Sequence, residues 1–143
     1  MKTGDIGVTL DRFVGACREN TRVVGAFLGG SHAAGTADEY SDLELYMIVD
    51  DQNYGTFFAE RRAFLGHLGE PVLFEDFSDF GFDMVVFIFS DGVEGELTLG
   101  RASGFDHIHG GPFEVLVDKE GILEGRVFPL HQPSQVEQRE TLR

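Results

Sequence analysis

The segment from Phe27 to Asp50 constrains the fold of this chain more than any other part of the sequence. It reads FLGGSHAAGTADEYSDLELYMIVD, in which one apolar strand ends at a Gly-Gly-Ser turn and a second begins with two acids. Asp42 and Glu44 are two residues apart, and side chains at this spacing on a strand point to the same face. The segment therefore predicts a pair of carboxylates on one face, one strand away from a glycine turn.

This pair of carboxylates suggests a chemistry. Two carboxylates beside free backbone N–H groups suit a divalent cation and the phosphates that it neutralises. Gly29, Gly30 and Ser31 would form the phosphate turn, because glycine lets the backbone approach closely and the hydroxyl can donate to a phosphate oxygen. Two simpler interpretations stay open, a tight turn without a ligand and a solvated strand edge for the acids. The combination of turn and acids favours nucleotide handling.

The remaining pattern predicts a mixed α/β (α+β) domain. Helices are expected over Leu10–Glu19, with Thr9 as N-cap, and over Tyr54–Leu68, and a short helical turn or loop over 31–37. Strands are expected over Val23–Leu28, Leu43–Val49, Pro71–Glu75, Phe82–Phe89, Glu94–Leu99 and Phe113–Val117. The turn at Ser90-Asp91-Gly92 predicts a hairpin between the strands on either side of it. Helices flanking a mixed sheet are the expected architecture.

Length and charge restrict the organisation and the partners. The 143 residues carry 11 Lys and Arg against 25 Asp and Glu, a net charge of −14. One domain is expected over 1–128, followed by a polar tail or linker over 129–143. So acidic a chain disfavours nucleic acid as a partner and favours a cationic small molecule. The alternative is that the acidity only aids solubility.

Cysteine content and hydropathy point to an intracellular protein. Cys17 is the one cysteine, which excludes an intrachain disulfide, and its helical spacing predicts a buried small apolar side chain. The N-terminus lacks the apolar region of a signal peptide, and no apolar run reaches the length of a membrane span. We expect a cytoplasmic protein that does not bind membranes.

The Gly-Gly-Ser turn followed by Asp42-Leu43-Glu44 resembles the signature of the DNA polymerase β-type nucleotidyltransferase superfamily. Its small-molecule branch, which modifies aminoglycoside and lincosamide antibiotics, is the most similar, and the resemblance covers roughly residues 10–125. It implies a twisted mixed sheet backed by helices. It also implies a third carboxylate on a later strand, for which Glu96 fits better than Glu94.

The resemblance implies a set of site residues. Mg²⁺ would be held by Asp42, Glu44 and Glu96, and Glu96 could instead accept the proton of the acceptor hydroxyl. Glu44 stands where aspartate is commoner, with a longer arm that can still ligate. The triphosphate of ATP or another nucleotide would lie on the glycine turn, with His32 as a further contact to phosphate or base or as a surface loop residue.

The sequence departs from this family in two respects. Many relatives have an arginine phosphate clamp where Ala34 stands, and Arg101 or one of Arg61 and Arg62 could compensate. The helical second domain common in the antibiotic-modifying branch would begin where this sequence ends, which suggests either a minimal form or part of a longer protein. The pair His107 and His109 resembles metal ligands in spacing but is more typical of a loop.

The sequence analysis therefore predicts a Mg²⁺-dependent nucleotidyltransferase that moves AMP from ATP to a hydroxyl of a small, cationic acceptor such as an antibiotic. Two alternatives remain. One is a non-catalytic module of the same fold that binds a nucleotide or a protein partner. The other is a nucleotidyltransferase that modifies a protein in a toxin–antitoxin pair. The acceptor, the preferred base and the oligomeric state, a homodimer included, stay open.

Overall fold

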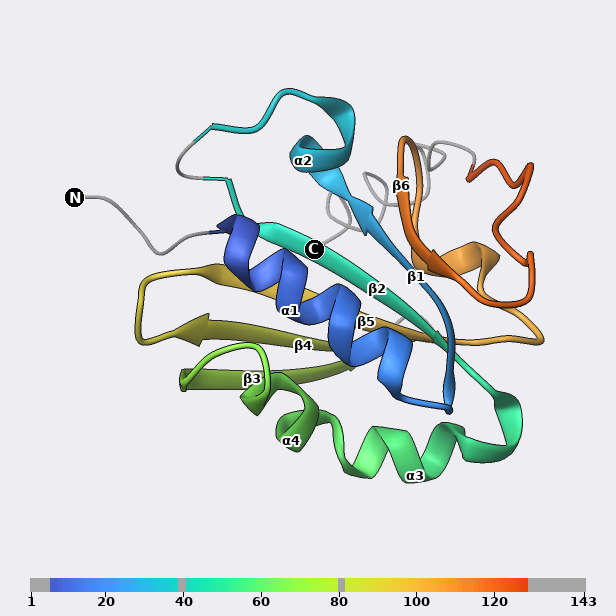
Figure 1. Ribbon diagram of the computed structural model, residues 1–143, viewed down its shortest axis with the longest axis horizontal. Coiled ribbons are helices and arrows are strands. Elements are labelled where there is room, and N and C mark those ends of the chain that lie inside the picture. The colour runs from blue at the N-terminus through green and yellow to red at the C-terminus, as the bar shows by residue number, and fades with distance from the viewer. Residues whose placement is uncertain (1–5, 39–40, 80–81, 129–143) are drawn as a thin grey trace, which may run out of the picture.

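In the computed structural model, which describes residues 6–38, 41–79 and 82–128, six strands form one mixed sheet (Figure 1). The strands are β1 (Val23–Gly29), β2 (Leu43–Val49), β3 (Pro71–Asp79), β4 (Phe82–Phe89), β5 (Glu94–Arg101) and β6 (Glu114–Asp118). Their order is β3-β4-β5-β2-β1-β6. β2 and β5 are parallel, whereas the other neighbouring pairs are antiparallel. The predicted mixed sheet and the β4–β5 hairpin are confirmed.

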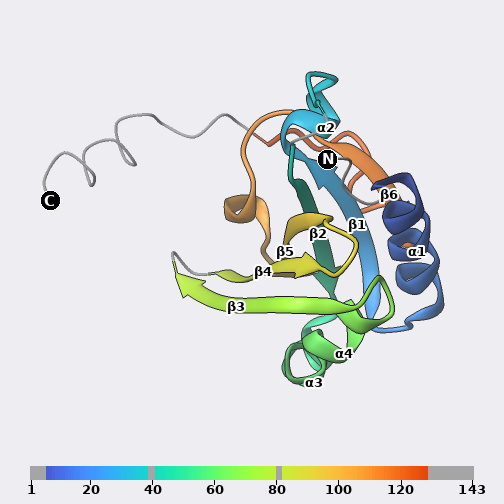
Figure 2. The same cartoon turned by 90° about the vertical axis from the view of Figure 1, so that its left-hand side faces the viewer.

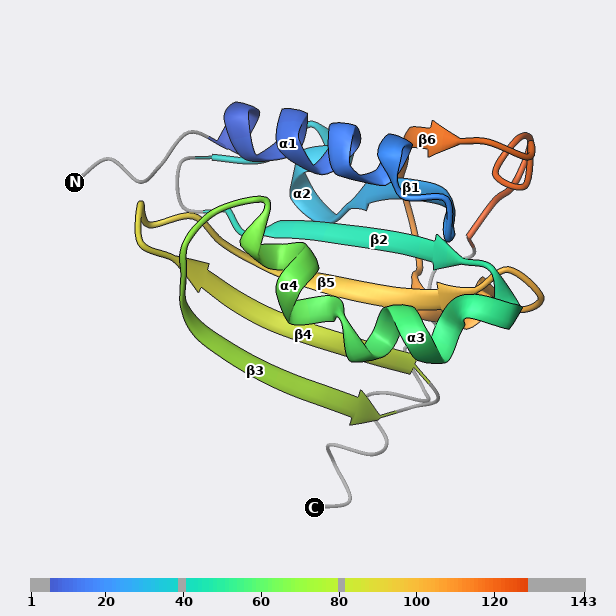
Figure 3. The same ribbon diagram turned by 60° about the horizontal axis from the view of Figure 1, so that its bottom comes forward.

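Three helices cover one face of the sheet, namely α1 (Ile6–Glu19), α3 (Tyr54–Ala59) and α4 (Arg61–Gly66) (Figure 3). Phe13 and Cys17 of α1 are fully buried against alternate residues of the strands, such as Leu45 and Met47 of β2. Burial raises the pKa of the Cys17 thiol to about 12, as expected for a thiol in an apolar core. The prediction that Cys17 is a buried apolar residue is confirmed.

The opposite face carries a smaller apolar cluster, which lies over β1 and β2. Alternation along the strands directs Phe27, Tyr46 and Ile48 to this side. They are covered by residues from the short helix η2 (Asp106–Ile108) and by Phe128. Figure 2, a view at right angles to Figure 1, shows α1 and the loop with η2 on opposite sides of the sheet. Both faces of β1 are therefore covered, which explains its uniformly apolar sequence.

Two predicted helices differ from the observed ones. The first begins at Ile6, so Thr9 is a buried residue within it and not its N-cap. The predicted helix over Tyr54–Leu68 is broken at Glu60, whose N–H bonds the Phe57 carbonyl, three residues earlier, at 2.9 Å. The break lets α3 and α4 both follow the sheet, and Phe57 and Phe64 meet with ring centroids 5.4 Å apart.

Strand boundaries also differ in places. β3 runs to Asp79, four residues beyond the prediction, because it pairs with β4 along its whole length. A turn of helix, α2 (Gly30–Ala34), follows β1, and the short helix η1 (Asp51–Asn53) follows β2. The predicted tail over 129–143 lies outside the described residues. Within the described part of the chain, no helix is both long enough and apolar enough to cross a membrane.

Candidate functional site

The glycine turn lies where β1 passes into α2, at one end of the sheet. Gly30 has a φ of +65°, a backbone conformation that favours glycine. A Cβ atom at this position would lie 1.9 Å from Oε2 of Glu44, which is far inside van der Waals contact. The backbone conformation therefore favours glycine at position 30, and any side chain there would have to displace the Glu44 carboxylate.

The strand pairing brings the predicted carboxylates to this same end of the sheet. Glu44 of β2 is the register partner of Gly29 in β1 and of Glu96 in β5. Asp42 precedes β2 by one position and is exposed. Burial and the nearby charges of Glu44 and Asp42 raise the pKa of the Glu96 carboxyl, which shows that the three acids share one electrostatic environment.

The Glu44 side chain leans toward the glycine turn. Its Oε1 accepts a hydrogen bond of 3.0 Å from the hydroxyl of Tyr46, and its Oε2 lies against Gly30. β1 and β5 flank β2 on opposite sides, so the carboxylate that contacts Gly30 lies on the β1 side of β2, whereas Glu96 belongs to the strand on the other side. Among the described residues, no three His, Cys, Asp or Glu side chains are gathered closely enough to hold a metal ion.

Tyr46 is itself held tightly. Its ring stacks on Phe27 with centroids 4.6 Å apart and meets the His109 ring edge-on at 4.8 Å, and only 6% of the residue is exposed. Burial and the adjacent Glu44 carboxylate raise the pKa of the Tyr46 phenol, so the hydroxyl stays protonated and remains a donor.

A cleft of about 420 Å³ opens beside the turn. Its walls come from α2, β2 and the loop after η2, and they include Ser31, Ala34, Glu44, Tyr46 and His109. Among the residues that line it, none is Lys or Arg. The cleft thus combines a glycine turn, a hydroxyl and a carboxylate with no fixed positive charge.

His109 is a cleft residue that the sequence pattern does not predict. It is buried, and its Nε2 lies 2.8 Å from the carbonyl oxygen of Pro112, to which it donates because a carbonyl only accepts. Its ring packs over Gly29, where a Cβ would come within 2.8 Å of it. The His-x-His-Gly-Gly sequence is typical of a loop and does not distinguish the two histidines. Only the tertiary structure does so, because His107 lines another pocket.

His32 takes a different place from the one predicted. Its Nε2 lies 3.3 Å from the carbonyl oxygen of Ser41, and it is not among the residues that line the cleft. The ring therefore connects α2 to the loop that leads to Asp42. The His32 ring is thus engaged with the Ser41 carbonyl, and its contact with phosphate or base stays a prediction.

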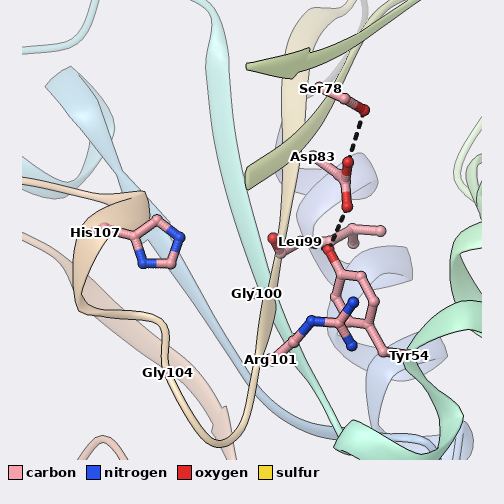
Figure 4. A pocket seen from close by; sticks show the side chains of 8 residues that line it. All are labelled: Tyr54, Ser78, Asp83, Leu99, Gly100, Arg101, Gly104 and His107. Carbon is pink, nitrogen blue, oxygen red and sulfur yellow. Dashed lines mark hydrogen bonds between the residues drawn. The ribbon is translucent and has the colours of Figure 1, made fainter. Parts of the chain in front are cut away.

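Arg101 is not brought to the site. It lies five residues beyond Glu96 on β5, roughly 16 Å along the strand, and an odd separation places the two side chains on opposite faces. Its guanidinium stacks 4.0 Å from the ring of Tyr54, in a pocket that also contains Ser78 and Asp83 (Figure 4). The suggestion that Arg101 compensates for Ala34 is therefore corrected.

Arg61 and Arg62 do not compensate either. Both pair with Asp76 of β3, at 2.8 and 3.0 Å, on the side of the sheet that carries the helices. The arginine clamp that the sequence resemblance implies has no basic substitute among the described residues that line the cleft.

Comparison with solved structures identifies this architecture. The chain is similar to the crystal structure of an aminoglycoside 6-adenyltransferase from Bacillus subtilis, with a TM-score of 0.51 and 18% sequence identity over 65% of this chain. This chain has a nucleotidyltransferase fold. The predicted mixed sheet with flanking helices is therefore shared with this adenyltransferase at the level of the fold.

The match covers 34% of the adenyltransferase, so this chain spans about a third of the length of that relative. No model of a known protein family and no curated protein matches the sequence. The nucleotidyltransferase fold thus rests on the structure, and the activity within that fold has to be argued from the residues of the site.

Proposed function

We propose that this chain binds a nucleoside triphosphate with Mg²⁺ beside the glycine turn and transfers the nucleoside monophosphate, AMP from ATP, to a hydroxyl of a small molecule. The observation that carries the proposal is the register of β2 and β5, which pairs Glu44 with Glu96 next to Gly29 and Gly30. Mg²⁺ sites in nucleotide enzymes need only one or two carboxylates, since substrate phosphates supply other ligands.

The donor set fits such a cation in charge and chemistry. Asp42, Glu44 and Glu96 offer hard oxygen ligands, and burial, followed by the nearby charges of Glu44 and Asp42, raises the pKa of Glu96. Asp42, Glu44 and Glu96 would hold the Mg²⁺, which would neutralise phosphate charge when bound. Of these, Glu44 would have to turn from Gly30 to face Glu96.

The proposed transfer is a displacement at the α-phosphorus of the nucleotide. The acceptor oxygen forms a bond to the α-phosphorus while the bond from that phosphorus to the bridging oxygen of the β-phosphate breaks, and pyrophosphate leaves. The proton of the acceptor hydroxyl passes to a carboxylate, and Glu96 is the candidate for this role as the alternative to its role as a metal ligand. Ser31 lines the cleft in a position to donate to a phosphate oxygen.

For the acceptor we propose a cationic small molecule, an aminoglycoside being the first to test. The net charge of −14 and the absence of Lys and Arg from the cleft lining support a cationic ligand over nucleic acid. The structurally similar protein is itself an aminoglycoside adenyltransferase by its description.

The test is incubation with each of the four nucleoside triphosphates, Mg²⁺ and a panel of aminoglycosides and lincosamides, read by mass spectrometry. An acceptor mass increased by one nucleoside monophosphate is the expected result. The product should disappear in Glu96→Gln and persist in Glu94→Gln, because Glu94 is an exposed acid on the same strand and face. Product formation that survives Glu96→Gln would contradict the assigned role of Glu96.

A second candidate is a non-catalytic nucleotide-binding module. Two observations favour it, namely Ala34 in place of the clamp and the lack of a three-carboxylate cluster among the described residues. Calorimetry distinguishes the two functions. ATP binding without any nucleotidyl product, in the presence of every acceptor, would support the module over the enzyme.

A further inference from the structure

The hydrogen bond between Tyr46 and Glu44 has a consequence for the candidate site. We propose that Tyr46 is a positioning residue, which holds the Glu44 carboxylate against Gly30 and so opposes the movement of that carboxylate toward Glu96. This inference rests on the proposed function, because it concerns how readily the site accepts a divalent cation. It assigns a role to a residue that the sequence motif does not include.

The positions of Tyr46 and Glu44 on β2 bring the tyrosine hydroxyl to the carboxylate. Tyr46 follows Glu44 by two residues on β2, so the two side chains share a face and the hydroxyl reaches Oε1 at 3.0 Å. The other oxygen, Oε2, is in contact with Gly30, on the β1 side of β2. Glu96 lies on the β5 side. A cation shared by Glu44 and Glu96 would therefore draw the Glu44 carboxylate toward β5.

The donor is also rigid. The Tyr46 ring is fixed between Phe27 and His109, and the His109 ring is in turn fixed by its hydrogen bond to Pro112. Packing on both sides of the ring restricts its rotamers, so the Tyr46 hydroxyl stays directed at the Glu44 carboxylate. A hydrogen bond to a charged group is among the stronger ones in proteins, which makes this restraint significant.

The length of the acid also contributes. Glutamate has one methylene more than the aspartate that is commoner at this position of the motif, and this extra reach lets the carboxylate contact both Gly30 and the Tyr46 hydroxyl. The shorter side chain introduced by Glu44→Asp would lose these contacts while keeping the charge. Position 44 therefore offers a variant that removes the restraint without removing the ligand.

The test uses Mn²⁺ alone as the probe, measured by calorimetry and by electron paramagnetic resonance on the full chain. Tyr46→Phe keeps the stacked ring and removes only the hydroxyl. We expect this variant to bind Mn²⁺ about 10- to 100-fold more tightly than the wild type, the range that corresponds to loss of one hydrogen bond to a charged group. Tyr54→Phe is the matched control, because its hydroxyl donates to Asp83 at 2.7 Å far from the cleft, and its Mn²⁺ affinity should be unchanged.

A double-mutant cycle separates positioning from general loosening. Glu44→Asp should itself gain affinity for Mn²⁺, and adding Tyr46→Phe in that background should bring no further gain. A crystal structure of Tyr46→Phe should show the Glu44 carboxylate displaced from Gly30. Equal or weaker Mn²⁺ binding by Tyr46→Phe, or Mn²⁺ binding by none of these variants, would overturn the proposal.

The outcome is distinguishable from a failure of the proposed function. Nucleotidyl product in the acceptor assay together with equal Mn²⁺ affinity in wild type and Tyr46→Phe would leave the enzyme standing and refute the role of Tyr46. The expected gain in Mn²⁺ affinity without any nucleotidyl product would support the role of Tyr46 in a binding module.

Discussion

Two buried tyrosine hydroxyls donate to carboxylates at opposite ends of the sheet, Tyr46 to Glu44 and Tyr54 to Asp83. Burial raises the pKa of both phenols. At the far end, Asp83 also accepts from Ser78 at 2.7 Å and a guanidinium stacks on the Tyr54 ring. At the glycine turn, the charges that act on the Tyr46 phenol are those of the carboxylates of Glu44 and Glu96.

This difference in surrounding charge distinguishes the Tyr54–Asp83 pair, which we regard as structural, from the Tyr46–Glu44 pair in the candidate site. Burial is the main cause of both raised pKa values; the positive charge of Arg101 offsets part of the rise at Tyr54, whereas the negative charges of Glu44 and then Glu96 add to the rise at Tyr46. The Tyr54–Asp83 pair has a second donor, Ser78, and a neighbouring guanidinium, that of Arg101, so the protein itself supplies its partners. At the glycine turn, Glu44 lines a cleft without Lys or Arg and has Glu96 as its register partner, so a cation would have to come from outside the cleft lining.

The largest expected effect is that of Gly30→Ala. The new Cβ would occupy the place of the Glu44 carboxylate in a backbone conformation that disfavours alanine, so we expect a loss of about 2–4 kcal/mol in the free energy of unfolding. Gly35→Ala is the control, because Gly35 also has a positive φ, of +78°, but nothing lies within 4 Å of its Cβ position. Its cost should be about 1 kcal/mol. Urea denaturation measures both, and equal losses would show that Glu44 does not lie against Gly30.

Tyr54→Phe, at the other end of the sheet, should lower stability without affecting nucleotide binding. Removing the hydroxyl leaves Asp83 with one donor fewer, and we expect a loss of about 1–2 kcal/mol in the free energy of unfolding. ATP binding should not change, because this pocket lies at the opposite end of β5. A weaker affinity for ATP in Tyr54→Phe would contradict the division into a structural pair and a ligand site.

Ala34→Arg adds a positive charge to the cleft where the protein provides none. Ala34 is exposed and lines the cleft, so an arginine there can reach a bound triphosphate. We expect ATP to bind about 3- to 10-fold more tightly at low salt, with a smaller gain at high salt because the charge is partly exposed. The gain should be lost in the Asp42→Asn background. A gain of equal size there would count against the proposed place of the triphosphate.

The smallest effect concerns the pH dependence of stability. A carboxyl whose pKa is raised in the folded state stabilises the fold at pH values below its unfolded pKa, and this contribution is lost as the pH rises through the folded value. Glu96→Gln should therefore increase stability near neutral pH, by a fraction of 1 kcal/mol because the side chain is only half-buried. Glu94→Gln should not. Thermal unfolding between pH 4 and 8 measures the difference, and a destabilised Glu96→Gln would disprove the repulsion.

The sequence by itself predicted the strands, apart from some of their boundaries. The apolar run that Asp42 and Glu44 open placed β2 correctly at Leu43–Val49, and the spacing of these two residues predicted two acids at one end of it. The strand period could also have excluded Arg101, because five residues from Glu96 is an odd separation. Local patterns suffice here because side-chain direction on a strand depends only on position along the chain.

Only the tertiary structure decided which of these residues meet. The parallel pairing of β2 with β5 makes Glu44 and Glu96 register partners, although 52 residues separate them in the sequence, and no local pattern specifies that register. The same holds for His109, which reaches the cleft while His107 does not. Helix propensity likewise gave no sign of the break at Glu60, because the break follows from packing two short helices on one twisted sheet. Contacts between distant segments depend on how the sheet is assembled, and that assembly fixes the chemistry of the cleft.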